Sequence, residues 1–234
     1  SAILHRSGTS STATNIALDK SRQTVTLTFA ETIPSGNASL EISFTGELND
    51  KLHGFYRSEY TDPEGETRYL ATTQFEATDA RRAFPCWDEP AHKASFDLTL
   101  VIPSDLVAIS NNPVVEEVAV EGGLKSLRFG ETPVMSTYLL AFIIGDLVAI
   151  HEQANERTKV GIYTTRGKED QGRFALDTSV KLLSFFNEYF GIPYPLEKLD
   201  HIAIPDFAAG AMENWGAITY RETALLVDPE NSSA

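Results

Sequence analysis

The feature that most constrains the fold of this chain is a set of short segments in which apolar and polar residues alternate. In residues 24–29 threonines alternate with Val, Leu and Phe, and the same period recurs in residues 40–44 and 96–102. This alternation predicts strands that have one face in a core and the other in water. No helical period is found before residue 150. We therefore expect residues 1–150 to form an all-β domain of sandwich or barrel type.

Two further segments extend this β pattern. Residues 114–120 and 124–129 flank a Glu-Gly-Gly turn, and this arrangement predicts a hairpin. Residues Tyr138–Ile144 are continuously apolar, which predicts a strand that is buried on both of its faces.

A helical period begins at Phe174 and ends at Gly191 and Pro193, where a helix stop signal stands. The apolar stripe of this helix comprises Leu176, Val180, Leu182, Leu183, Phe185, Phe186, Tyr189 and Phe190. A ligand groove is one interpretation of such an aromatic stripe. A helix that packs on a core is the more common meaning, and it is the one we expect.

The remaining segments after residue 150 complete a second unit. Residues 158–164, 199–204 and 217–220 predict three short strands around the helix. We therefore expect residues 151–234 to begin a second domain of mixed α and β structure.

The composition argues against several kinds of partner. The chain has 19 Lys and Arg against 33 Asp and Glu, a formal charge of −14, whereas nucleic acids and anionic membranes need a basic surface. The longest apolar run is too short to span a bilayer, so we expect no transmembrane segment. The single cysteine, Cys86, fits a packed thiol and a reducing compartment, and we expect a cytoplasmic location.

Two segments contain residues that could form a binding site for a ligand. Residues 205–216 place Gly210 and three alanines close to the carboxylate of Glu213. Small residues let the main chain approach a ligand, and a bound peptide could be held there as an added strand is. An ordinary glycine-containing turn explains the same spacing. The other segment, residues 74–90, contains Glu76 and ends in Asp-Glu-Pro.

Residues 210–214 read Gly-Ala-Met-Glu-Asn, the GAMEN exopeptidase signature. With the flanking residues 204–207 and 215–216, the segment 74–90 and the residues 189–195, the chain resembles zinc aminopeptidases of the aminopeptidase N and puromycin-sensitive type. The resemblance implies a mostly β N-terminal domain with saddle-like sheets, followed by the start of an α+β, thermolysin-like catalytic domain. It also implies that peptides with a free N-terminus are the substrates.

The resemblance assigns roles to individual residues. Glu213 and Glu76 would bind the α-ammonium group of the substrate, and Gln74 and Ala209 would line the pocket for its first side chain. Main-chain groups of the signature would hold the peptide around the scissile bond. The implied substrate-binding set is Gln74, Glu76, Ala209, Gly210, Ala211, Met212, Glu213 and Asn214.

Physical chemistry agrees with two glutamates in this role. The α-ammonium group has a pKa of roughly 8 and is largely charged at neutral pH. Two carboxylates that converge on it form short, charge-assisted hydrogen bonds. An internal or acetylated peptide leaves the two carboxylates unpaired. Sites of this kind discriminate by roughly 10⁴-fold in kcat/KM against a substrate that lacks the group they bind. Because Glu76 and Glu213 fall in different predicted domains, we expect the ammonium pocket at the domain boundary.

The chain departs from the resembled family in its metal site. No His-Glu-x-x-His segment is present, so neither metal ligands nor catalytic residues are expected in this chain. Zinc would belong to the parent enzyme, and the remainder of the parent polypeptide would be a partner of this piece. We expect the piece to be truncated at both ends and inactive alone.

Two other interpretations stay open. One is a non-catalytic β-rich peptide-binding or interaction module built on the same scaffold. The other is the related branch that also opens a lipid epoxide, which resembles this chain less at Glu76.

Overall fold

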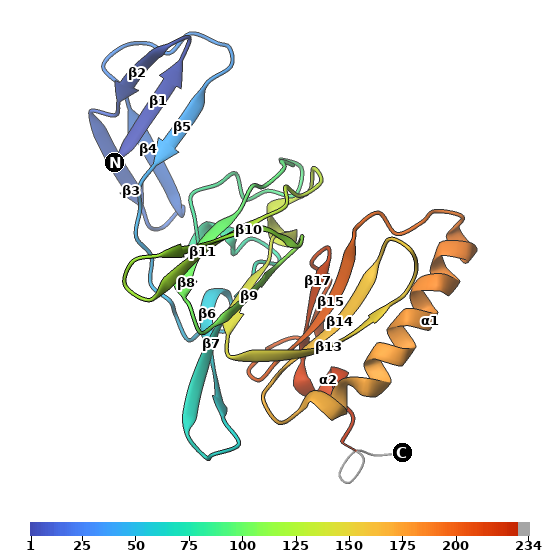
Figure 1. Cartoon of the computed structure of the whole chain (residues 1–234). Helices are drawn as coiled ribbons and strands as arrows, with labels where there is room; N and C mark the ends of the chain where they lie inside the picture. Colours follow the sequence, from blue (N-terminus) through green and yellow to red (C-terminus); the bar gives the residue numbers. More distant parts are fainter. Residues whose placement is uncertain (229–234) are drawn as a thin grey trace.

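The computed structural model describes residues 1–228, so residues 229–234 of the predicted second domain lie outside the described residues. The chain begins with a small lobe, residues 1–48, that stands apart at one end of the molecule (Figure 1). Its strands are all antiparallel and form a three-stranded and a two-stranded sheet. The first has the order β2 (Thr9–Thr12), β1 (Ala2–Arg6), β5 (Ser39–Ile42), and the second pairs β3 (Asn15–Asp19) with β4 (Thr24–Thr28).

Two more antiparallel sheets form the middle of the molecule. The four-stranded sheet has the order β6 (Gly54–Thr61), β7 (Thr67–Gln74), β12 (Phe142–Gly145), β9 (Val107–Ser110). The three-stranded sheet has the order β10 (Val114–Val120), β11 (Leu124–Phe129), β8 (Thr99–Pro103). The predicted hairpin is therefore confirmed as β10 and β11.

A five-stranded mixed sheet forms the C-terminal part. Its order is β13 (Leu147–Gln153), β14 (Lys159–Thr165), β15 (Lys198–Ile204), β17 (Ala217–Arg221), β16 (Ala211–Met212). Strand β15 runs parallel to β14 and β17. The helix α1 (Arg173–Phe190) covers one face of this sheet, and the short helix α2 (Glu222–Leu225) follows β17 (Figure 1). Three single turns of 3₁₀ helix complete the elements: η1 (Ala80–Arg82), η2 (Thr137–Leu139) and η3 (Glu169–Gly172).

The largest core joins the middle sheets to the five-stranded sheet. It contains Phe75 and Phe142 from the four-stranded region, whose rings meet edge to face, together with Ile202 and Met212 from the five-stranded sheet. This core spans residue 150, and β13 runs through that position. The domain division at residue 150 stays a prediction, because the structure packs the two parts against each other.

The predicted fold class is confirmed: the chain is mostly strands, and the long helix α1 lies in its C-terminal part. The end of that helix is also confirmed, since Gly191 adopts the left-handed conformation with φ 63° and its N–H bonds to Glu188.

One predicted strand is partly wrong. The apolar run Tyr138–Ile144 begins in the 3₁₀ turn η2, and only its last residues form β12. The buried side chain of Asn111 explains the difference. Its amide donates to the carbonyl of Leu139, and its oxygen accepts from the N–H of Ala141. These bonds satisfy main-chain groups that a strand would have paired with a neighbouring strand.

The strand predicted for residues 96–102 also starts later than expected, at Thr99. The main chain of Phe96 bonds to the main chain and hydroxyl of Thr132 instead of following a regular ladder. Apolar alternation continues through this irregular segment, so the pattern alone did not mark its boundary.

The expectation that the aromatic stripe of α1 packs on a core is wrong for most of the stripe. Leu176 and Leu183 are buried against Val160 and Ile162 of the sheet. Five other residues of the stripe are exposed: Leu182, Phe185, Phe186, Tyr189 and Phe190. A helix that lies on a single sheet buries only the side turned toward that sheet, and these side chains extend around the other side.

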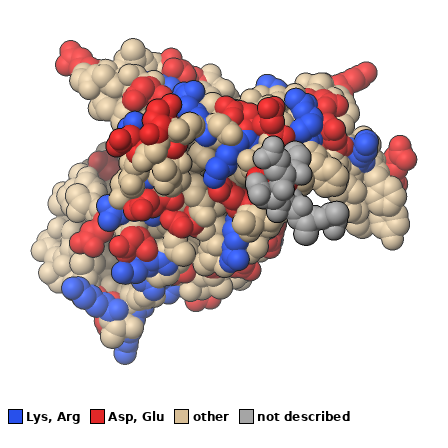
Figure 2. Space-filling model, turned by 90° about the horizontal axis from the view of Figure 1, so that it is seen from below, with Lys and Arg blue, Asp and Glu red and all other residues tan. Residues whose placement is uncertain are grey.

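Charged side chains are spread over the surface. On the face shown in Figure 2, acidic and basic residues are interspersed and form no single continuous patch. Within residues 1–228, none of the helices combines the length and the apolar character needed to cross a bilayer.

Candidate substrate-binding site

The segment 205–216 lies at the edge of the five-stranded sheet. It leaves the carboxyl end of β15, forms the short strand β16 and returns as β17. Among the described residues 1–228, strand β16 is the last strand of the sheet and pairs only with β17. Its free side is therefore open to a further strand.

The register of β16 determines which main-chain groups reach this open side. Ala211 lies opposite Tyr220, and the N–H of Arg221 donates to the carbonyl of Gly210 at 3.0 Å. In an antiparallel pair, hydrogen-bonded and non-hydrogen-bonded positions alternate. Ala211 is thus a non-hydrogen-bonded position, and its N–H and C=O point away from β17 toward the open edge.

The side chains of the signature divide into two groups. Those of Ala209, Ala211 and Glu213 are exposed, as is Gly210. Met212 is fully buried in the main core, and Asn214 is buried with its amide donating to the hydroxyl of Thr219 at 3.2 Å. Met212 and Asn214 therefore shape the loop from inside, while Glu213 presents its carboxylate to solvent.

The upstream segment follows β7. Gln74 is the last residue of this strand, and its side-chain oxygen is buried with no hydrogen-bond partner in the described part of the chain. Glu76 is exposed, whereas Phe75 between them is fully buried. The peptide bond from Glu76 to Ala77 is cis. Gln74 and Glu76 are thus placed at the end of a strand, with Phe75 as the anchor.

The turn after Glu76 is held by an ion pair. Arg81 donates from its main-chain N–H and from Nε to one carboxylate oxygen of Asp88, at 3.0 and 2.9 Å. Its terminal nitrogen donates to the carbonyl of Asp88 as well. Arg81 and Asp88 therefore act in the structure of the segment.

Cys86 lies in the same segment. Burial, and to a lesser degree the carboxylate of Asp88, raises the pKa of its thiol to about 11. A thiol of this kind is protonated at neutral pH and is a poor nucleophile. The residue is a packed thiol, as its neighbours in the sequence indicated.

The two predicted segments share one core. Phe75, the neighbour of Glu76, and Met212, the neighbour of Glu213, are both fully buried members of the same hydrophobic cluster. Both glutamates are exposed beside these anchors. Convergence of the two carboxylates on one ammonium group stays a prediction, and this shared core is the geometry that supports it.

Asp206 ties the start of the loop to the middle sheet. Its main-chain N–H donates to the hydroxyl of Ser58, and its carbonyl accepts from the hydroxyl of Tyr56 at 2.9 Å. Its carboxylate accepts from the N–H of Glu59. These bonds link strand β6 to a residue nearly 150 positions away in the sequence.

Arg221 and Asn111 hold other parts of the loop. Arg221 donates from Nε to the carbonyl of Phe207 at 3.0 Å and from a terminal nitrogen to that of Ala208. Asn111 donates to the carbonyl of Trp215 at 2.8 Å. Sequence reasoning missed both residues. Arg221 could have been suspected as a cation at a strand end, but no local pattern marks Asn111.

A metal site is not found among residues 1–228. No group of three or more His, Cys, Asp or Glu side chains there is arranged to hold a metal ion. The residues that the structure describes do not fit a zinc site, and no reaction step can be assigned to one from them.

Comparison with known sequences gives two family matches. The profile of the peptidase M1 N-terminal domain matches residues 2–139, and the profile of the peptidase family M1 domain matches residues 174–234.

Curated relatives agree with these matches. Aminopeptidase M1-B of Oryza sativa subsp. japonica is 57% identical over 90% of this chain and 24% of its own length. Aminopeptidase M1 of Arabidopsis thaliana is 52% identical over 95% of this chain and 25% of its own length. The puromycin-sensitive aminopeptidase of Caenorhabditis elegans is 46% identical over 97% of this chain and 24% of its own length. The chain thus spans about a quarter of the length of the curated relatives it matches.

Proposed function

This chain belongs to peptidase family M1, and from that premise we propose that it forms the part of a zinc-dependent aminopeptidase that recognises the free α-amino group of a peptide. Its fold is a mostly β M1 N-terminal domain followed by the start of the M1 catalytic domain. The relatives named above are aminopeptidases, which supports the same activity for the parent of this chain.

One observation carries the proposal: the open edge of β16. The main chain of Ala211 faces this edge, and the exposed carboxylate of Glu213 follows two residues later. A peptide that adds to the edge as a strand would be held by main-chain hydrogen bonds, independent of its sequence. Glu213, together with Glu76, would then bind the ammonium group at the first residue of that peptide.

The zinc ligands of the proposed enzyme would come from polypeptide outside the described residues, because residues 1–228 provide no metal site. When bound, zinc would polarise the scissile carbonyl and activate water. The role of this chain is to bind and align the substrate. Purified by itself, with zinc added, the 234-residue chain should hydrolyse no aminoacyl reporter substrate.

The proposal is tested in the full-length enzyme that contains this chain. Glu213→Gln keeps the size of the side chain but removes its charge. We expect kcat/KM for a free-amine aminoacyl substrate to fall by about 30- to 900-fold, which corresponds to the loss of about 2–4 kcal/mol for a charged partner. Glu76→Gln should act in the same direction.

Glu117→Gln is the matched control, because Glu117 is an exposed glutamate on β10 in another sheet. It should leave kcat/KM within about twofold. Unchanged kinetics in Glu213→Gln would remove Glu213 from its proposed role. If the full-length protein binds free-amine peptides through Glu213 without hydrolysing any, the alternative of a non-catalytic peptide-binding module would be favoured. A cytoplasmic location stays a prediction that rests on the single, packed Cys86.

A further inference from the structure

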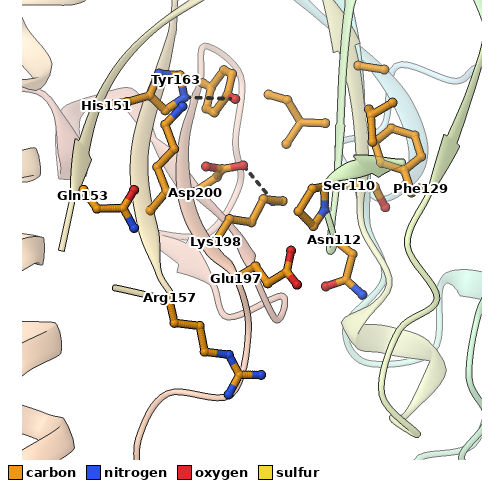
Figure 3. Close-up of a pocket in the computed structure, with 15 residues that line it drawn as sticks. Ser110, Asn112, Phe129, His151, Gln153, Arg157, Tyr163, Glu197, Lys198 and Asp200 are labelled. Carbon is orange, nitrogen blue, oxygen red and sulfur yellow. Dashed lines mark hydrogen bonds and ion pairs between the residues drawn. The ribbon is translucent and has the colours of Figure 1, made fainter. Parts of the chain in front are cut away.

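A buried ion pair lies on β15, the strand that leads into residues 205–216, called here the substrate-binding loop. Lys198 and Asp200 are two residues apart and so project from the same face of the sheet. The ammonium of Lys198 lies 2.7 Å from a carboxylate oxygen of Asp200, and the two side chains are only 12% and 5% exposed. Figure 3 shows them pointing toward each other beside a pocket of about 360 Å³.

The same ammonium group reaches the far end of the loop. Lys198 Nζ donates to the carbonyl of Gly216 at 2.7 Å, and the main-chain N–H of Asp200 donates to that carbonyl at 3.1 Å. Gly216 is the last residue of the segment 205–216. Its carbonyl is therefore held by two donors, both from the ion pair.

Gly216 is also packed tightly from the other side. It has φ 74°, and a Cβ atom added to it would lie 2.1 Å from the carbonyl oxygen of Asn111. Only glycine fits this position without strain. The end of the loop is thus held between Lys198 on β15 and Asn111 of the middle part of the molecule, with little freedom to shift.

The carboxylate of Asp200 is positioned by the neighbouring strand. Gly161 of β14 lies opposite Asp200, and a Cβ atom at Gly161 would lie 2.6 Å from its second carboxylate oxygen. The missing side chain makes room for Asp200 to turn toward β14 while it keeps its contact with Lys198. The arrangement therefore depends on Lys198, Asp200 and Gly161, which the fold brings together from two strands.

Burying this ion pair costs free energy, because both charged groups lose contact with water. Burial lowers the pKa of Lys198, and the nearby Asp200 partly offsets that effect. Buried ion pairs are often no more stable than apolar residues of similar size, so general stability is a weak reason for one here. A specific hydrogen bond that an apolar side chain cannot make is a better reason, and Gly216 receives that bond.

We propose that Lys198 and Asp200 are positioning residues for the substrate-binding loop, holding Gly216 so that Ala211 and Glu213 face the bound peptide. The inference rests on the proposed function, because it assigns these residues an effect on substrate that passes through the loop. In this proposal their effect on substrate passes through Gly216 and not through direct contact. The start of the loop is fixed by Arg221, and Lys198 fixes its end.

The test is a double-mutant cycle in the full-length enzyme. Lys198→Met keeps an unbranched side chain of similar length but cannot donate to Gly216. We expect it to lower kcat/KM for a free-amine substrate by about 10- to 100-fold, the effect of a small misplacement of binding groups. In an enzyme that already carries Glu213→Gln, the same substitution should lower kcat/KM by less than about threefold, because coupled residues are not additive.

Lys159→Met is the matched control, since Lys159 lines the same pocket but its side chain makes no hydrogen bond or ion pair with the loop in the described part of the chain. It should change kcat/KM by less than about twofold. If Lys198→Met fails to fold, Asp200→Asn takes its place in the cycle, because it keeps the main-chain bond to Gly216 and removes the charge partner.

The outcomes separate the two proposals. A full and additive loss for Lys198→Met in both backgrounds, or no loss in either, would overturn the positioning role. If Glu213→Gln itself leaves the kinetics unchanged, the proposed function fails instead. A loss in the wild-type background that largely vanishes beside Glu213→Gln supports the inference.

Discussion

The N-terminal lobe and the five-stranded sheet are both built from short strands, yet they differ in burial. In the lobe, residues 1–48, Ala2 is the only buried residue, and Leu18 on β3 is 74% exposed. In the five-stranded sheet, Val160 and Ile202 are fully buried. The sheet has α1 on one face and the middle part of the molecule on the other, whereas in the lobe many apolar residues are exposed, among them Ile16, Val25 and Phe44.

The difference shows what alternation can and cannot indicate. A period of two predicts which residues share a face of a strand. Whether that face is covered depends on another element that packs against it, often from a distant part of the chain. The lobe residues predicted to have one face in a core therefore form their strands, but their apolar faces remain largely open to solvent.

The largest expected effect comes from the sheet. Ile202→Ala removes a fully buried side chain from the core that joins the two parts of the molecule. We expect it to lower the free energy of unfolding by about 2–5 kcal/mol, because it removes apolar burial and leaves a cavity. Urea unfolding of the 234-residue chain measures this. A loss under about 1 kcal/mol would show that this core is less closely packed than the structure indicates.

The second-largest effect is expected from acidification, which should lower the free energy of unfolding through a histidine of the five-stranded sheet. His201 on β15 is buried between α1 and β17, where Ser179 and Tyr220 contact its ring nitrogens at 2.6 and 3.1 Å. Burial lowers the pKa of His201 to about 4. The unfolded chain binds this proton near pH 6.5, so stability is complete above that pH and falls as the pH drops toward 4, by about 3 kcal/mol in all.

The control for this effect is His201→Gln, which has no group that titrates in that range. Unfolding of both proteins is followed between pH 7 and pH 4. The difference between the two stability curves should shrink on acidification, because only the wild-type chain must bury an imidazole that prefers to be charged. Parallel curves over this range would contradict the assignment.

The smallest effect is expected in the lobe. Leu18→Ala deletes a similar number of carbon atoms to Ile202→Ala, but at an exposed position. We expect a change within about 0.5 kcal/mol in the same urea experiment. A loss comparable to that of Ile202→Ala would mean that the apolar face of the lobe is covered in solution, and the contrast between the two regions would disappear.

Much of the architecture could be predicted from local pattern. The helix α1 and its stop at Gly191, the hairpin of β10 and β11, and the strands on either side of the signature all follow from periodicity and turn residues. The signature itself stands out because Gly210 and the alanines near Glu213 are unusual in combination.

Other features could not be predicted, because they depend on contacts between distant residues. Asn111 bonds to Trp215, which is 104 positions away, and its other bonds hold the start of the expected strand 138–144, which begins in a 3₁₀ turn. The exposed aromatic side of α1 was expected to be buried, since an apolar stripe does not reveal how much of it a neighbour covers.

Local sequence patterns identify the long helix, the hairpin, many of the strands and the signature around Glu213, but not every strand boundary. These are local properties of backbone preference and side-chain period. Packing between distant segments, by contrast, makes β16 an edge strand, turns the main chain of Ala211 toward the open side of that strand, and places Gly216 between Lys198 and Asn111. Those outcomes depend on how separate segments pack, because a hydrogen bond between distant residues forms only after the chain has brought them together.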